Sequence, residues 1–178
     1  YGYNHSQAYV AEVLNTARAL TGLPTSSPTD ELDACLSAGD TGKVQRVVGG
    51  GRMVRIPGQP GQLIDARILA DVLALQRTYH FTVTAGYAPT GHDATGEHPL
   101  GLAVDVVPGP GGSWDLIDAL AHWAEPTQDH PRPPFRWVGY DGDPGHGRGN
   151  HLHLSWAHSP TPGAQPPAAW VSVLIPPA

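Results

Sequence analysis

A single carboxylate inside an apolar strand places the strongest constraint on how this chain can fold. Residues 101–108 read GLAVDVVP, and the β-branched residues around Asp105 are typical of a strand in a protein interior. A carboxylate in such a strand must be paired, hydrogen-bonded or bound to a metal, because an isolated buried charge is very costly. The fold must therefore bring compensating groups to Asp105.

The alternation of side chains gives this predicted strand two different faces. Asp105 shares one face with Ala103, while Leu102, Val104 and Val106 point to the other face. The leucine and valine face is expected to pack on the core. The small side chain of Ala103 leaves room for a ligand beside the carboxylate.

Three histidines can reach this carboxylate. His98 lies on the preceding turn, and Gly101 allows the chain to bend so that the imidazole returns over Asp105. In the stretch NHLHLSW, His151 and His153 are two positions apart on a predicted strand, so both rings point to one side. Two imidazoles and one carboxylate are a common ligand set for catalytic zinc. Either all four groups bind the metal, or three bind it and the remaining imidazole acts as a base.

Each motif alone has a simpler interpretation. A single Asp in an apolar strand is more often capped by backbone donors, and an H-x-H pair more often lies in a core or on a surface without a metal. A chain of that kind would be a structural domain with satisfied buried histidines. The order of the two motifs, an H-x6-D strand motif followed by a strand H-x-H, favours a shared metal site instead.

The rest of the chain is predicted to alternate short helices and strands. The 22 glycines and 19 prolines among 178 residues require much of it to be turn and loop. Two short strands around Gly49–Gly51 are expected to form a hairpin. Helices are expected at 6–21, 63–79 and 113–125, the last with Ser113 as its N-cap, and further strands at 80–87, 101–108, 135–140, 150–156 and in the tail segment AAWVSVLI.

This mixture predicts the α+β class, a small antiparallel sheet with flanking helices. Residues 1–57 form an N-terminal helical and hairpin segment, either separate or part of the same domain. Residues 58–178 form the domain that carries the metal motifs. The length suits one well-buried domain rather than two.

Composition excludes several function classes. A net charge of −6 leaves no basic surface to follow a phosphate backbone, so nucleic acid is not an expected partner. No apolar run approaches the roughly 20 residues that a membrane-spanning helix needs. Cys35 is the only cysteine, which excludes an intrachain disulfide and a cysteine-rich zinc cluster. The sequence begins without Met and shows no signal peptide, as expected of a mature, processed chain.

The stretch HPLGLAVD resembles the H-x-x-G-x-A-x-D motif of the zinc D-Ala-D-Ala carboxypeptidases and related peptidoglycan endopeptidases, and HLH resembles their H-x-H motif. This group also includes lysostaphin-type enzymes and the amino-terminal domain of sonic hedgehog. The resemblance covers roughly residues 63–157. It implies that His98, Asp105 and His153 bind zinc, and that His151 is the general base or stabilises the transition state. It also implies a hedgehog-like fold, with the zinc on the face of a four-stranded antiparallel sheet.

Two positions depart from the pattern of this family. Its usual small hydroxyl residue, two positions before the first histidine, is replaced by Gly96, with Thr95 beside it. Many carboxypeptidase-type members carry an arginine shortly after a strand like TVTAGY, where this chain has Tyr87-Ala88-Pro89. An arginine fork is the natural receptor for a free carboxylate, so its loss favours an endopeptidase over a carboxypeptidase.

The predicted function is zinc-dependent hydrolysis of peptide bonds in the stems or cross-links of bacterial peptidoglycan. His92, His146 and Arg148 are candidate substrate-binding residues on loops that flank the same cleft. Asp141 and Asp143 either hold the ring of His151 or are plain turn residues. We expect a monomer that is secreted, associated with the cell wall, or delivered by a phage. The alternative function is a non-catalytic, zinc-bearing binding module of the same fold.

Overall fold

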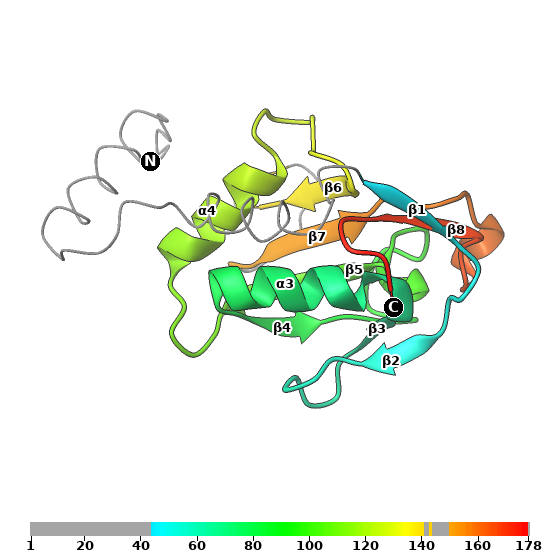
Figure 1. Ribbon diagram of the computed structural model, residues 1–178, viewed down its shortest axis with the longest axis horizontal. Coiled ribbons are helices and arrows are strands. Elements are labelled where there is room, and N and C mark those ends of the chain that lie inside the picture. Colours follow the sequence, from blue (N-terminus) through cyan, green and yellow to red (C-terminus); the bar gives the residue numbers. More distant parts are fainter. Residues whose placement is uncertain (1–43, 141–142, 144–149, 178) are drawn as a thin grey trace, which may run out of the picture.

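The computed structural model describes residues 44–140, 143 and 150–177 (Figure 1). The helix expected at 6–21 and the candidate residues Asp141, His146 and Arg148 lie outside the described residues. The strands are β1 (Gln45–Val48), β2 (Met53–Arg55), β3 (Leu63–Asp65), β4 (Phe81–Ala85), β5 (Ala103–Pro108), β6 (Phe135–Gly139), β7 (Leu152–Trp156) and β8 (Trp170–Val173). The helices are α3 (Leu69–Tyr79) and α4 (Trp114–Ala124), with short 3-10 turns η1 (Ala66–Ile68), η2 (His98–Leu100) and η3 (Pro162–Ala164).

A four-stranded antiparallel sheet with the order β4-β5-β7-β6 forms the centre of the fold. Helices α3 and α4 lie over one face of this sheet (Figure 1). Val104, Leu152 and Leu154 on that face share one buried cluster with Leu75 of α3 and with side chains of α4. Asp105 and His153 are directly paired across β5 and β7, and by strand alternation they point to the opposite face.

Local signals account for the bounds of both helices. Ser113 caps α4 as predicted, because its side chain accepts a hydrogen bond from the backbone N–H of Leu116 at 3.3 Å. Helix α3 begins later than the predicted residue 63, because Leu63–Asp65 pairs with β2 as a strand. It ends at Tyr79, and the next residue, His80, caps the helix with a positive φ of 51°.

The hairpin expected around Gly49–Gly51 is wrong. Strand β1 pairs with β8 and strand β2 pairs with β3, both antiparallel. The buried guanidinium of Arg67 explains why the chain separates here, since it donates to the carbonyl groups of Gly49 at 3.2 Å and Ala168 at 2.9 Å. A Cβ on Gly51 would lie 2.4 Å from Pro167 and 2.7 Å from that guanidinium. Gly51 therefore allows close approach to a distant segment, whereas Gly49 and Gly50 adopt positive φ values of 71° and 73° in open space.

A second buried carboxylate ties the end of the chain to α3. Asp71 accepts hydrogen bonds from the Trp156 indole at 2.8 Å and from the backbone N–H groups of Leu174 at 2.9 Å and Ile175 at 2.7 Å. Asp71 is fully buried, so these three donors replace the water that the carboxylate loses on folding.

The combination of helices with small antiparallel sheets agrees with the predicted α+β class. The strands predicted at 80–87, 101–108, 135–140 and 150–156 all form, with slightly shorter bounds. In the part of the chain that the structure describes, no helix has the length and apolar character needed to cross a bilayer.

Candidate metal centre

A tight turn brings His98 back over strand β5. His98 opens η2, and Gly101 ends it with a φ of 69°, its N–H donating to the carbonyl of His98 at 3.0 Å. A Cβ on Gly101 would lie 2.7 Å from the Met53 sulfur, so no larger residue fits without a shift. The turn places Nε2 of His98 3.2 Å from Oδ1 of Asp105, as the sequence predicted.

The three predicted ligands lie together on the sheet face. Nδ1 of His153 is 2.9 Å from Oδ1 of Asp105 and 3.3 Å from Nε2 of His98. All three residues are buried, with exposed fractions of 3% for His98, 7% for Asp105 and 8% for His153. One carboxylate oxygen and two ring nitrogens therefore converge on a single point.

The backbone fixes the protonation of the His98 ring. Its Nδ1 lies 2.6 Å from the carbonyl oxygen of Gly86, and because a carbonyl only accepts, Nδ1 carries a proton. In the neutral ring, Nε2 is then unprotonated, and its lone pair points at Asp105 and His153. A metal-bound histidine commonly donates its other N–H to a backbone carbonyl in this way. Only a proton or a cation at this point satisfies the facing lone pairs.

Charges at this point depend on one another. Burial raises the pKa of the Asp105 carboxyl, but hydrogen bonds from His153 and from the protonated form of His98 outweigh burial and hold that pKa well below its usual range. Burial lowers the pKa of His98, but the hydrogen bond and charge of Asp105 and the Gly86 carbonyl raise it above its usual value. Asp105 is therefore ionised at neutral pH and supplies a negative charge to a cation.

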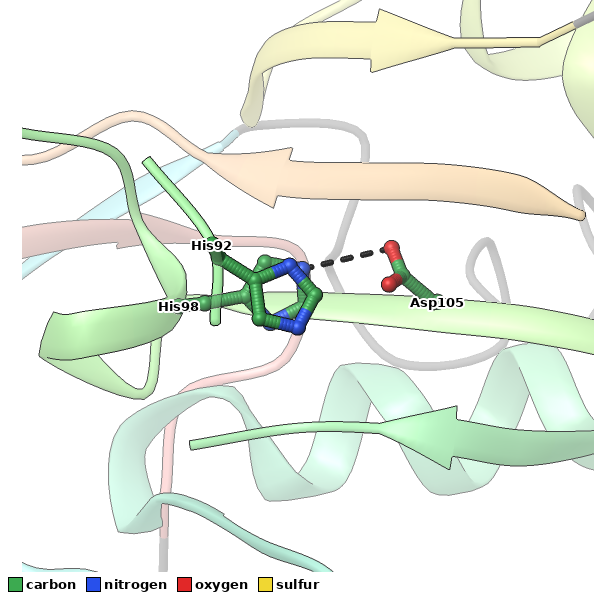
Figure 2. A group of neighbouring side chains, drawn as sticks. All are labelled: His92, His98 and Asp105. Carbon is green, nitrogen blue, oxygen red and sulfur yellow. Dashed lines mark hydrogen bonds and ion pairs between the residues drawn. The ribbon is translucent and has the colours of Figure 1, made fainter. Parts of the chain in front are cut away.

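His92, expected as a substrate-binding residue on a flanking loop, lies directly against this centre. Its ring stacks on that of His98, with centroids 3.9 Å apart and planes 27° from parallel (Figure 2). His92, His98 and Asp105 form a group that could hold a metal ion, with ligand atoms within 4.8 Å of one another. Burial, with the nearby His98, lowers the pKa of His92, which favours its neutral, metal-binding form. Unlike the other two residues, His92 is exposed.

His151 stands at the edge of the same centre. Its Nε2 lies 3.8 Å from Oδ1 of Asp105, and 19% of its side chain is exposed, against 10% for His153. Asp143 accepts hydrogen bonds from the backbone N–H of Tyr140 at 2.8 Å and from Gln128 at 3.0 Å. These contacts agree with the interpretation of Asp143 as a turn residue.

Two neighbours of the centre were not found from the sequence. One is the carbonyl of Gly86, whose role no side-chain pattern can reveal. The other is Trp137, whose ring centroid lies 4.9 Å from that of His153. Nε2 of His153 is buried and has no hydrogen-bond partner among the described residues.

The chain was also compared with known proteins. No family model matches it, and no match was found among curated proteins or among solved structures. The function must therefore be argued from the residues and their geometry.

Proposed function

We propose that this chain is a zinc-dependent peptidase that hydrolyses peptide bonds in the stems or cross-links of bacterial peptidoglycan. The observation that carries the proposal is the convergence of His98, Asp105 and His153, with ligand atoms 2.9–3.3 Å apart. The H-x-x-G-x-A-x-D and H-x-H motifs that supply these residues resemble those of the peptidoglycan metallopeptidases. A hedgehog-like or D-Ala-D-Ala-peptidase-like fold is part of the same proposal.

The distances between these atoms fit a tetrahedral zinc site. Ligand atoms at a bond length of about 2.0–2.1 Å from a tetrahedral ion lie about 3.3 Å from one another. Imidazole nitrogens favour zinc over magnesium or calcium, which prefer oxygen ligands. Three protein ligands leave a fourth position open, as catalytic zinc sites do. His92 is the other candidate for a third ligand beside His98 and Asp105.

His151 has the position of a general base in this proposal. A zinc ion bound here would lower the pKa of a water molecule and polarise the peptide carbonyl. His151 lies beside the ligands on their more exposed side, with its Nε2 3.8 Å from Asp105. Its imidazole takes a proton from the attacking water and delivers it to the leaving amine. The departures at Gly96 and Tyr87 favour cleavage inside a stem or cross-link over removal of a terminal residue.

The test is digestion of purified peptidoglycan, with released fragments identified by mass spectrometry. Samples are the native protein, the protein stripped with EDTA, the stripped protein with zinc restored, and His151→Ala. The matched control is His122→Ala, which removes an exposed histidine of α4. We expect zinc-dependent release that is lost in His151→Ala, while this variant still binds one zinc and His122→Ala stays active.

Other outcomes decide against a peptidase. If the native protein binds one zinc and releases nothing from several wall types, the chain is a zinc-bearing binding module. If it neither binds zinc nor releases fragments, both functions are wrong.

A further inference from the structure

Strand β6 is irregular next to the metal centre. Phe135 pairs with Trp156 and Trp137 pairs with Ser155, so the register with β7 shifts at Arg136. This is a β-bulge, in which one extra residue redirects the side chains around it, often beside functional sites.

The bulge sends neighbouring side chains to different faces of the sheet. Phe135 packs in the core, with its ring centroid 5.3 Å from that of Trp156. Trp137 faces the metal side, 4.9 Å from the ring of His153. In a regular strand these two residues, two positions apart, would point the same way. The extra residue therefore brings an indole, and Arg136 beside it, to the face that carries the metal centre.

Arg136 is held at this face by a buried partner. Its Nε lies 3.1 Å from Oε1 of Glu97, the residue that precedes His98. Nε2 of His158 lies 3.5 Å from the same oxygen. The Arg136 side chain remains 53% exposed, and its guanidinium makes no other hydrogen bond among the described residues. Glu97 thus orients the guanidinium while its two Nη groups stay available to a ligand.

Other arginines of the described chain are used differently. Arg67 is buried in its pair with Asp65. Arg46 and Arg132 lie over the rings of Trp170 and Trp123. Among the described arginines, Arg136 is the one with an ion-pair partner adjoining the metal centre.

We propose that Arg136 and Trp137 form the substrate subsite next to the metal, where Arg136 receives a peptide carboxylate and Trp137 packs against the aliphatic part beside it. The inference rests on the proposed peptidase function. An arginine fork matches a carboxylate in two parallel hydrogen bonds, and an indole gives apolar contact. Trp137 pairs with Ser155, which lies two residues, or about 7 Å, along β7 from His153. The subsite is therefore close to the metal, and the carboxylate it receives belongs to a residue near the scissile bond.

The carboxylate can come from a free C-terminus or from an acidic side chain, and three peptides separate these sources. They are N-acetyl-D-Ala-D-Ala, its C-terminal amide, and the amide of N-acetyl-D-Glu-D-Ala. Binding is measured by calorimetry on the zinc-loaded His151→Ala protein, which prevents turnover in the proposed mechanism. Arg136→Gln and Arg136→Lys are compared with Arg77→Gln, a matched change at an exposed arginine of α3.

We expect at least one carboxylate peptide to bind about tenfold or more tightly than the plain amide. Arg136→Gln should weaken binding of that peptide by about 10- to 100-fold and change binding of the plain amide by less than about threefold. The control, Arg77→Gln, should bind both peptides as the protein with the native residue does. Arg136→Lys should recover only part of the loss, because an ammonium lacks the fork. The peptide that loses affinity identifies the source of the carboxylate.

Equal binding of acid and amide, or a preference that survives Arg136→Gln, would overturn the subsite, as would no binding of any peptide. The two proposals fail separately. Hydrolysis of peptidoglycan by the native protein, with the preference intact in Arg136→Gln, refutes the subsite alone. An Arg136-dependent preference without any hydrolysis refutes the peptidase alone.

Discussion

Replacing His153 with alanine should weaken zinc binding far more than replacing His92. Both histidines can complete a group with His98 and Asp105, so this comparison decides which residues hold the metal. Nδ1 of His153 lies 2.9 Å and 3.3 Å from the other two ligand atoms and is buried. His92 is exposed and contacts the centre by stacking its ring on that of His98.

The size of the effect follows from the role of each residue. Loss of a residue that only orients metal ligands typically costs 10- to 100-fold in affinity. Loss of a direct ligand must exceed this, so His153→Ala should weaken zinc binding by more than about 100-fold, or about 2.7 kcal/mol. His92→Ala should cost no more than about tenfold, the low end of that range, because its ring only stacks on His98, whose Nδ1 is already held by the Gly86 carbonyl.

The assay is competition for zinc with a chromophoric chelator at neutral pH, with folding of each variant checked by circular dichroism. His122→Ala, on the exposed side of α4, is the control and should keep the native affinity. Thermal unfolding gives an independent reading. Free zinc at about 100 times its dissociation constant should stabilise the native protein by about 2.7 kcal/mol, and the same concentration should stabilise His153→Ala by less than about 0.4 kcal/mol.

Equal losses in the two variants, or a larger loss in His92→Ala, would refute this reasoning. The metal would then belong to His92, His98 and Asp105, and His153 would serve to hold the Asp105 carboxylate.

Three further predictions concern pH and stability. Zinc affinity should decrease as the pH falls, because a proton on Nε2 of His98 excludes the metal. Burial lowers the pKa of His98, but Asp105 raises it by more, so the decrease should begin above pH 6.5. Chelator competition between pH 8 and 5 measures this, and a flat profile would contradict it. Asp71→Ala should lower the free energy of unfolding in urea by about 3 kcal/mol or more, because the Trp156 indole and two backbone N–H groups lose their acceptor. The exposed Asp115→Ala should cost under about 1 kcal/mol. Gly101→Ala should reduce zinc affinity by displacing His98, while Gly111→Ala, with a similar positive φ but open space around it, should reduce stability alone.

Local patterns were enough to predict much of the sheet and its site. Apolar alternation placed the four central strands, and the period of two put Asp105 on a face away from the core. The same period aimed His151 and His153 to one side, where both now lie within 4 Å of Asp105. These predictions depended on residues close together in the chain, where the geometry of a strand fixes direction.

Pairings between distant segments were beyond the reach of such patterns. Strand β1 pairs with β8, and the groups that favour this pairing, the Arg67 guanidinium and the Ala168 carbonyl, lie far apart in sequence. The bulge at Arg136 is hidden for a related reason. The stretch FRWVG reads as an ordinary short strand, and only its register against β7 shows that one residue is extra.

The three buried aspartates of the described chain differ in the kind of group that holds each of them. Asp65 is paired at 2.7 Å with Arg67, whose charge is permanent. Asp71 accepts from an indole and two backbone N–H groups, none of which can lose its proton at ordinary pH. Asp105 instead faces three imidazoles, and a neutral imidazole carries a ring-nitrogen lone pair that can bind a metal. The partners of Asp105 are thus groups that can either donate to its carboxylate or share a cation with it, whereas the partners of Asp65 and Asp71 can only hold them in place.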